Sequence, residues 1–487
     1  MLHDLIEFFE PSLRDDADKT AIVTPDGEQI TYRRLGAILD AYGARASSAG
    51  ISRGNAVTLH DVSMTQYLCL VIALSRLGAV HVRAPDPDGG AARVDCVIVD
   101  KASGLSGPNV VRMDLSWPYP GEPLAGARGG GFASQDDVCI IMGTSGSTGL
   151  PKQLGISLGL MAVQMKDAHT NLGPFNPRLL LVIPPTLSFG LELCLLQFRA
   201  GQQIVLPGRT HQHALAQMID GQVDDVIASP AVYSAWIELL KRENLRLDTV
   251  KRAIIGGSIA SRALLASVQE YICKVLISAY GSSEVGAIAA GRVDEFVSVD
   301  DAVGRLSPWV DVRITDDQGH ELPNGRMGQL SFRLKLGRRL TPYIGEPPLG
   351  ADDWFVSGDI GTLTPDGFLC IQGRTNEVMN VGGNKISPTL VETAVSEFLG
   401  TTEPVCAFGM PGSAGFDEVV IIVSAQCSAR LKELPDYLEQ ADLGLGRVHI
   451  LAIRTFPLNE FGKVDKIKLR EMVGAEIARR RMQSRGG

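Results

Sequence analysis

Three absences in the sequence exclude or disfavour whole classes of protein. The eight cysteines stand singly and far apart, without a CxxC pair, so thiolate metal sites and redox-active loops are disfavoured. No apolar run reaches the roughly 18 residues of a membrane span. The amino-terminal stretch MLHDLIEFFEPSLRDD carries acids where a secretory signal needs a basic region. We therefore expect a reduced, cytoplasmic protein with no membrane span.

The chain also has fewer basic than acidic residues. Lysine and arginine together number 46 against 55 aspartates and glutamates, and the formal net charge is −9. Proteins that bind the phosphate backbone of nucleic acids need a basic surface, so nucleic acid is not an expected partner. What the chain does have is length and apolar content. Its 487 residues, 45% of them hydrophobic, suffice for more than one folded core.

Short apolar runs alternate with amphipathic stretches along the first part of the chain. The runs that begin at residues 56, 138, 179 and 252 are typical of buried strands, and the stretch from Thr31 to Gly50 has helical periodicity. This alternation predicts an α/β fold of mixed or parallel sheets with flanking helices. Between about residues 296 and 373, short strands separated by turns predict a small β-rich region.

The pattern changes again after Gly373. The polar, glycine-rich stretch RTNEVMNVGGNKISP precedes a helix from Ser387 and a strand near residue 418. The remaining segment of about 110 residues is a typical small-domain size. We predict two domains: residues 1–374, which include the β-rich region at about 296–373, and a small mobile α+β domain at residues 375–487.

The segment GTSGSTGLPKQ, from Gly143 to Gln153, directly follows the predicted strand VCIIM. Its glycines, hydroxyl side chains and lysine offer backbone N–H groups, hydroxyl donors and a cation to phosphate oxygens. A Walker loop needs Gly, Lys and Ser or Thr in succession, whereas Leu150 and Pro151 separate Gly149 from Lys152, so a P-loop GTPase or kinase is excluded. The alternative is a flexible loop without a ligand.

That loop and four later segments, taken in order, resemble the adenylate-forming superfamily of acyl-CoA synthetases, aryl-acid ligases, stand-alone adenylation enzymes and luciferases. The later segments are AYGSSEVG (279–286), VSGDIG (356–361), GRTNEVMNVGGNKISP (373–388) and FPLNEFGKVDKIKLRE (456–471). The resemblance covers nearly the whole chain. It implies a ligase that uses ATP and Mg²⁺ to convert a carboxylic acid into an acyl-adenylate, releases pyrophosphate, and then transfers the acyl group to a thiol.

The resemblance assigns the phosphates and the metal to two segments. Magnesium prefers hard oxygen ligands, and Glu284 matches the family's magnesium-binding acid, with Thr148 as a second ligand. Ser283 stands where threonine is commoner and keeps the hydroxyl that meets the α-phosphate. The residues implied to hold the β- and γ-phosphates are Thr144, Ser145, Gly146, Ser147, Thr148, Gly149 and Lys152.

The adenosine part of the nucleotide is assigned to other residues. A carboxylate has two acceptor oxygens and a diol has two donors, and Asp359 in SGD matches the acid that accepts both ribose hydroxyls. Tyr280 supplies an aromatic face for adenine, and Arg374 matches the basic residue near ribose and phosphate. The remaining implied nucleotide contacts are Gly257, Ser258, Gly281 and Ser282.

By the same resemblance, the last motif provides the catalytic lysine, and the glycine-rich stretch provides the hinge between the domains and the contact with the thiol. Lys463 matches the lysine that bridges the attacking carboxylate and the α-phosphate, where a cation between two anions counts most in the transition state. Asn376 occupies the hinge position, which is usually Asp or Lys in the family. Gly382 and Gly383 fit a backbone that closely approaches the pantetheine arm of the thiol.

The acid is less sharply defined. Family members that activate α-amino acids place an aspartate after an aromatic residue, but the matching stretch PPTLSFGLELC has no acid from Ser188 to Gly190. A buried ammonium without a counter-charge is costly, so amino acids are disfavoured, although Glu192 lies close in sequence. We expect a small aryl or short acyl acid. The pocket residues implied are Ser188, Phe189, Ile255, Gly256 and Val285.

Together these features predict an acid–thiol ligase that works on a small carboxylic acid. The acceptor is coenzyme A or the phosphopantetheine of a separate carrier protein, and a homodimer is one option for the assembled state. Two alternatives stay open: an adenylating enzyme with an amine or other non-thiol acceptor, and a pseudo-enzyme that binds nucleotide without turnover.

Overall fold

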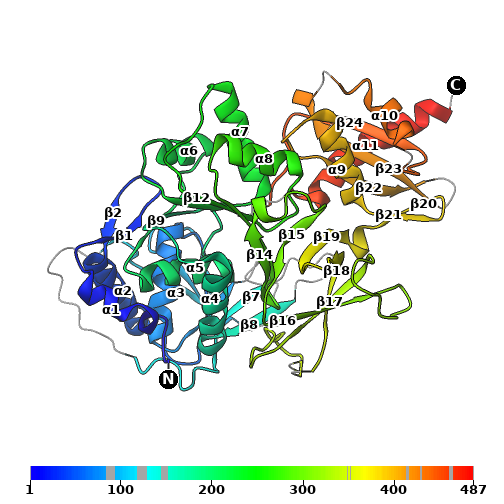
Figure 1. The fold of residues 1–487 in the computed structure, drawn as a ribbon. Helices are drawn as coiled ribbons and strands as arrows, with labels where there is room; N and C mark the ends of the chain where they lie inside the picture. Colours follow the sequence, from blue (N-terminus) through cyan, green and yellow to red (C-terminus); the bar gives the residue numbers. More distant parts are fainter. Residues whose placement is uncertain are drawn as a thin grey trace. The chain divides into compact units, whose positions relative to one another are not determined.

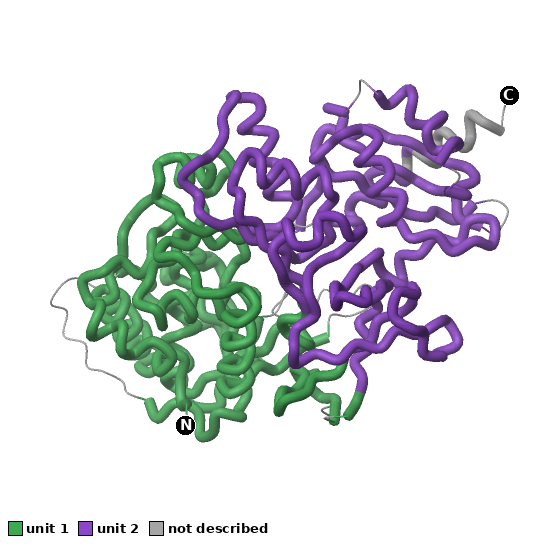
Figure 2. The backbone as a smooth tube through the Cα atoms, in the orientation of Figure 1, with its two compact units in different colours: residues 1–227, 281–288, 333–353 green, residues 228–280, 289–332, 354–487 purple. Residues whose placement is uncertain are grey.

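The computed structural model describes residues 2–83, 94–117, 129–143, 152–347, 349–350, 352–412, 416–427, 430–441, 443–459 and 464–485. The chain forms two compact units, shown in different colours in Figure 2. Unit 1 comprises residues 1–227, 281–288 and 333–353, and unit 2 comprises residues 228–280, 289–332 and 354–487. Among the described helices, none is both long and apolar enough to cross a membrane.

Unit 1 contains a mostly parallel sheet with the strand order β6-β5-β3-β4-β7-β8. Only the pair β7–β8 is antiparallel, and the predicted phosphate loop connects these two strands in the chain. Fully buried residues such as Ile98 and Ile140 explain why these strands are nearly continuous apolar runs. The strands are β3 (Ala56–Leu59), β4 (Val80–Arg83), β5 (Cys96–Asp100), β6 (Val110–Met113), β7 (Val138–Gly143) and β8 (Gln153–Ser157).

A second set of strands in unit 1 has the order β11-β9-β10-β1-β2, parallel except for β1 and β2. The strands are β1 (Thr20–Val23), β2 (Gln29–Thr31), β9 (Arg178–Leu181), β10 (Gln203–Val205) and β11 (Asp225–Ala228). Helix starts follow local signals: Ser63 and Gln66 form a capping box before α3, and the Ser157 hydroxyl accepts from Leu160 N–H before α4. The helices are α1 (Glu10–Asp15), α2 (Tyr32–Ser48), α3 (Met64–Arg76), α4 (Leu158–Leu172), α5 (Ser188–Arg199) and α6 (His211–Ile219).

Unit 2 contains strands in the order β16-β17-β18-β19-β15-β14-β13-β12. The pair β12–β13 is parallel, whereas β14–β15, β15–β19, β17–β18 and β18–β19 are antiparallel. The elements are α7 (Pro230–Arg242), β12 (Arg252–Gly256), α8 (Arg262–Tyr271), β13 (Leu276–Ser282), β14 (Gly286–Arg292), β15 (Ala302–Leu306), β16 (Val310–Thr315), β17 (Gly328–Leu334), β18 (Phe355–Leu363) and β19 (Phe368–Arg374).

The carboxyl-terminal part of unit 2 has hydrophobic cores of its own. Strand β23 sends Val419 and Ile421 to one core and Val420 and Ile422 to another, as alternating side chains on a sheet must. All buried members of both cores lie between residues 379 and 473. The elements are β20 (Met379–Val381), β21 (Asn384–Ile386), α9 (Pro388–Leu399), β22 (Cys406–Pro411), β23 (Asp417–Ser424), α10 (Leu434–Gln440), β24 (Val448–Ile453) and α11 (Lys466–Arg485).

The predicted fold class is confirmed. Mixed and parallel sheets with flanking helices precede the antiparallel strands β15 to β19, and an α+β segment follows (Figure 1). The boundary between residues 374 and 375, and the mobility of the segment after it, stay predictions.

Candidate active site

A buried carboxylate in unit 2 has a partner at each of its oxygens. Asp359 on β18 is 7% exposed and lies opposite Arg374 in the register of β18 and β19. Arg374 Nε is 3.2 Å from Asp359 Oδ1, and the Tyr280 hydroxyl on β13 donates to Oδ2. Burial raises the pKa of Asp359, and the hydrogen bond from Tyr280 and the charge of Arg374 oppose that rise. Three residues predicted from separate motifs therefore meet around one carboxyl group.

The end of β12 and the loop that follows it contain four further predicted residues. Ile255 is buried, whereas Gly257 and Ser258 are exposed. A Cβ atom on Gly256 would lie 2.7 Å from the carbonyl oxygen of Ala279 on the neighbouring strand β13, so only glycine fits there. Gly257 has a φ of +89°, which side chains other than glycine rarely adopt. Close packing at Gly256 and the positive φ of Gly257 therefore both require glycine at the end of β12.

In unit 1, a second carboxylate is held by a residue that the motifs do not mark. The Tyr343 hydroxyl donates to Glu284 Oε1 at 2.9 Å, and the Thr341 N–H donates to the Glu284 carbonyl at 2.8 Å. Burial and the nearby Glu284 carboxylate raise the pKa of Tyr343, so its phenol keeps the proton that it donates. The Glu284 side chain is half-buried, and neighbouring Ser283 is exposed.

The same segment brings in the lysine of the predicted phosphate loop. Gly155 N–H donates to the Pro342 carbonyl at 2.9 Å, and Ile344 N–H donates to the Gln153 carbonyl at 2.8 Å, so residues 342–344 run along β8. Lys152 Nζ consequently lies 4.5 Å from the centre of the Tyr343 ring and 3.0 Å from Glu346 Oε1. Tyr343 thus contacts Lys152 through its ring and Glu284 through its hydroxyl.

Seven of the predicted site residues lie outside the described part of the chain. The segment from Thr144 to Gly149 (Thr144, Ser145, Gly146, Ser147, Thr148 and Gly149) and the catalytic candidate Lys463 both fall there. Their assignments stay predictions.

The predicted acid-pocket residues are divided between the units. Ser188 and Phe189 open α5 in unit 1 and are half-buried, and Val285 in the same unit is 5% exposed. The Ser282 hydroxyl accepts from Val285 N–H at 3.2 Å, and a Cβ on Gly281 would lie 2.4 Å from the Gly286 carbonyl oxygen, which shows how tight this loop is. Ile255 and Gly256 belong to unit 2.

The predicted hinge is followed by a half-buried ion-pair cluster. Asn376 lies in a short 3₁₀ helix, η3 (Thr375–Glu377), and Gly382 and Gly383 form the exposed turn between β20 and β21. Lys466 Nζ at the start of α11 lies 2.7 Å from Glu377 Oε2 and 3.4 Å from Glu392 Oε1. Burial alone would lower the pKa of Lys466, but Glu392 and Glu377 outweigh it and raise the pKa. Nothing in the sequence distinguishes Lys466 from a surface lysine.

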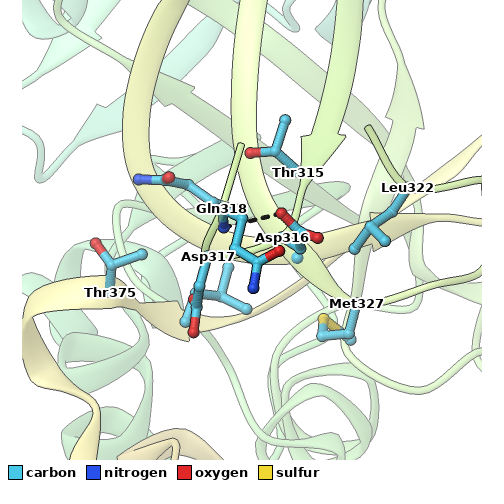
Figure 3. Close-up of a pocket in the computed structure, with 10 residues that line it drawn as sticks. Thr315, Asp316, Asp317, Gln318, Leu322, Met327 and Thr375 are labelled. Carbon is cyan, nitrogen blue, oxygen red and sulfur yellow. Dashed lines mark hydrogen bonds between the residues drawn. The ribbon is translucent and has the colours of Figure 1, made fainter. Parts of the chain in front are cut away.

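A pocket of about 380 Å³ in unit 2 is lined by none of the predicted acid-binding residues. Figure 3 shows it beside the turn that carries Asp316, Asp317 and Gln318, with Thr375 and Met327 on other sides. Asp316 Oδ1 accepts from Gln318 N–H at 2.9 Å, and hydrogen bonds from the backbone lower the pKa of its carboxyl group. None of the residues predicted to bind the acid or the phosphates lines this pocket, so it adds no support to their assignment.

Comparisons with known proteins agree with the arrangement of the motifs. The profile of a family described as "AMP-binding enzyme" matches residues 9–335. The 3-methylmercaptopropionyl-CoA ligase of Ruegeria lacuscaerulensis is 26% identical over 291 residues, which is 56% of this chain and 53% of that protein. This chain therefore matches about half the length of that relative.

Two further similarities extend over almost the whole chain. The indoleacetate–CoA ligase of Aromatoleum aromaticum is 24% identical over 515 residues, covering 96% of this chain and 98% of that protein. The amide bond synthetase McbA from Marinactinospora thermotolerans has a similar fold, with a TM-score of 0.78, 22% identity, and coverage of 96% of this chain and 99% of that one.

Proposed function

Because the chain belongs to the AMP-binding enzyme family, we propose that it is a ligase that activates a carboxylic acid with ATP and Mg²⁺. The products of the first step are an acyl-adenylate and pyrophosphate, and the acyl group then passes to a thiol. The acid is a small aryl or short acyl acid, and the thiol belongs to coenzyme A or to the phosphopantetheine of a carrier protein.

The observation that carries the proposal is the arrangement around Asp359. Its two oxygens each have spare acceptor capacity beyond the contacts with Tyr280 and Arg374, so both hydroxyls of a ribose can donate to it. The Arg374 side chain is 50% exposed and is available to an adjacent phosphate. Tyr280 offers a ring face to adenine while its hydroxyl holds the carboxylate in place. These residues therefore fit the nucleotide.

The residues of unit 1 fit the metal and the phosphates. Tyr343 occupies Oε1 of Glu284, which leaves Oε2 for a hard cation. Among the described residues, no three His, Cys, Asp or Glu side chains gather as a metal site, so Glu284 would share the ion with phosphate oxygens. Bound there, Mg²⁺ neutralises charge on the phosphates. Lys152 adds a cation, and Thr144 to Gly149 supply N–H and hydroxyl donors.

The chemistry of the first step follows from these roles. A carboxylate oxygen of the acid attacks the α-phosphorus, the bond from that phosphorus to the bridging oxygen breaks, and pyrophosphate leaves with the electron pair. Lys463 lies between the two anions and Ser283 donates to the α-phosphate, so both stabilise charge that builds up in the transition state. In the second step the thiol loses its proton to solvent and its sulfur attacks the acyl carbon, the bond from that carbon to the phosphate oxygen breaks, and AMP leaves with the electron pair. Asn376 provides the hinge, and Gly382 and Gly383 admit the thiol arm.

Acid-dependent exchange of labelled pyrophosphate into ATP, measured without a thiol, tests the first step. A panel of aryl, short acyl and amino acids should give exchange with an aryl or short acyl acid. Adding coenzyme A, a phosphopantetheinylated carrier or an amine to the active acid then identifies the acceptor. Nucleotide binding without exchange for every acid would instead support the pseudo-enzyme, and amide formation would support the amine acceptor.

A further inference from the structure

A buried polar cluster in unit 1 takes no part in the chemistry described above. It consists of Gln164 and Asp167 on α4, Glu192 on α5, and Arg338 and Thr341 from the segment after β17, and we call it the α4–α5 cluster. Gln164 and Asp167 are three residues apart and so share one face of α4. Gln164, Asp167, Glu192 and Thr341 are 8%, 5%, 5% and 3% exposed. So many polar groups in a core normally hold one another or a ligand.

Within the cluster, Asp167 and Arg338 satisfy each other's charge and hydrogen bonds. Arg338 donates to Asp167 through Nε at 2.8 Å to Oδ2 and through Nη2 at 2.6 Å to Oδ1. This two-pronged contact matches the planar guanidinium to the carboxylate, and it cancels their charges. The Asp167–Arg338 pair therefore presents no net charge to a neighbouring molecule.

The rest of the cluster is not satisfied. Gln164 Nε2 donates to Thr341 Oγ1 at 3.2 Å, but Gln164 Oε1 has no hydrogen-bond partner within the described part of the protein. Burial, with a smaller contribution from the nearby Asp167, raises the pKa of Glu192 to about 8, and among the described residues no hydrogen bond or cation acts in the opposite direction. Glu192 is therefore a neutral carboxylic acid at pH 7. Both side chains keep unused hydrogen-bonding capacity inside the core.

The cluster adjoins residues of the predicted acid pocket. Glu192 follows Ser188 by four residues on α5, so the two share one helix face. A Cβ on Gly286, the residue after Val285, would lie 3.6 Å from Gln164 Cγ and 3.7 Å from Nε2. Thr341, which binds Gln164, also donates through its N–H to Glu284. Glu284, Val285 and Gly286 are consecutive in the chain, and Gly286 lies next to the Gln164 side chain. Gln164 therefore lies beside the segment that carries Glu284.

We propose that the acid substrate carries a hydroxyl group at the end remote from its carboxylate, and that Gln164 Oε1 and Glu192 bind this hydroxyl. The inference rests on the proposed function, because it assigns the far end of the acid to the α4–α5 cluster. A hydroxyl can donate to Gln164 and accept from the protonated Glu192 at once. An ammonium would find a counter-charge only by taking the proton from buried Glu192, since Asp167 is already paired with Arg338.

Matched pairs of acids test this proposal on the wild-type protein. Benzoate against 4-hydroxybenzoate, cinnamate against its 4-hydroxy derivative, and hexanoate against 6-hydroxyhexanoate differ only in the terminal hydroxyl. For at least one pair we expect the hydroxylated acid to bind at least tenfold more tightly by calorimetry and to give at least tenfold higher kcat/KM in pyrophosphate exchange. A site built to bind a hydroxyl discriminates strongly against the analogue that lacks it.

Substitutions locate the preference. Gln164→Leu should reduce the tenfold preference to less than twofold, while Glu192→Gln, which keeps a donor and an acceptor, should retain most of it. The control is Gln217→Leu on α6, which removes a buried glutamine whose amide is bonded to Gly208 and Leu206. That variant should keep the full hydroxyl preference, so a general effect of core substitution would be recognised.

Calorimetry and pyrophosphate exchange together distinguish a failure of the hydroxyl site from a failure of the proposed ligase function. Exchange activity with equal use of hydroxylated and plain acids, or a preference unchanged in Gln164→Leu, would overturn the inference and leave the proposed function standing. Selective binding of hydroxylated acids without any exchange would support the hydroxyl site and contradict the ligase. Absence of both binding and exchange across all pairs would overturn the inference together with the function on which it rests.

Discussion

Tyr343 donates a hydrogen bond of 2.9 Å to Glu284, a residue 59 positions earlier in the chain. The contact fixes one oxygen of a half-buried carboxylate and leaves the other available, and Lys152 lies over the ring of the same tyrosine. If Glu284 holds Mg²⁺, Tyr343 is the side chain that sets the direction of its free oxygen.

The first prediction concerns magnesium. Removing the hydroxyl in Tyr343→Phe should raise the Mg²⁺ concentration for half-maximal pyrophosphate exchange by about tenfold, because a hydrogen bond to a charged group contributes about 1.5–3 kcal/mol. Glu284→Gln should lower exchange further, and the double variant should be no worse than Glu284→Gln alone, since both act on one interaction.

Tyr437→Phe is the matched control for this experiment, because Tyr437 stacks on Phe398 within the carboxyl-terminal core. It should leave the magnesium dependence unchanged. An identical magnesium dependence in wild type, Tyr343→Phe and Glu284→Gln would refute the metal assignment.

The second prediction concerns the ribose. Wild-type protein should bind ATP at least tenfold more tightly than 2′-deoxy-ATP, because the deoxy sugar leaves one acceptor position on buried Asp359 unused. Asp359→Asn should bind ATP more weakly and should discriminate much less between the two nucleotides. Titration calorimetry with both nucleotides measures this directly. A wild-type protein that does not distinguish them would show that Asp359 does not receive the ribose.

The third prediction concerns stability and pH. Glu192 ionises near pH 4.5 in an unfolded chain and near pH 8 in the fold. Between these values the unfolded chain loses a proton that the folded protein keeps, so wild-type stability should fall as pH rises from 4.5 to 8. Glu192→Gln removes this dependence. Its stability relative to wild type should rise by roughly 3 kcal/mol between pH 5 and pH 7.5, at about 1.4 kcal/mol per pH unit.

Denaturant unfolding at both pH values measures that difference. Glu243→Gln is a suitable control, since the Glu243 side chain is 61% exposed and should not change the pH profile. Parallel pH profiles for wild type and Glu192→Gln would contradict the neutral state of Glu192.

The fourth prediction separates the two half-reactions. Lys463→Ala should reduce pyrophosphate exchange by at least a hundredfold, because a cation at the developing charge acts mainly in the transition state. Thioester formation from supplied acyl-adenylate should stay within a few-fold of wild type. Lys468→Ala changes a 66% exposed lysine in the same segment and should affect neither step. Equal losses in both half-reactions for Lys463→Ala would remove the proposed division of roles.

The sequence predicts the fold class and the segments of the site, but not how these segments meet. Asp359 and Arg374 come from separate motifs, and their contact depends on the register of β18 with β19, which is a long-range property of the sheet. The apolar runs and turn residues that predict the strands are local, so they are visible in the sequence.

The contacts of Tyr343, Lys466 and Gln164 show why the rest was not predictable. Tyr343 lies in TPYIGEP, a stretch without periodicity, and reaches Glu284 only because the backbone runs beside β8. Lys466 resembles a surface lysine until α9 places Glu392 next to it. The amphipathic pattern of α4 reports that one face is buried, but an unpaired oxygen on Gln164 depends on what packs against that face.

The most direct test of the account follows an oxygen atom. The acid that supports exchange is labelled with ¹⁸O in its carboxylate, and the products of turnover with ATP and the thiol are weighed by mass spectrometry. Attack of the carboxylate on the α-phosphorus predicts one ¹⁸O atom in AMP and none in pyrophosphate. Formation of ADP, or AMP that carries no ¹⁸O from the labelled acid, would contradict the acyl-adenylate on which the proposed function depends.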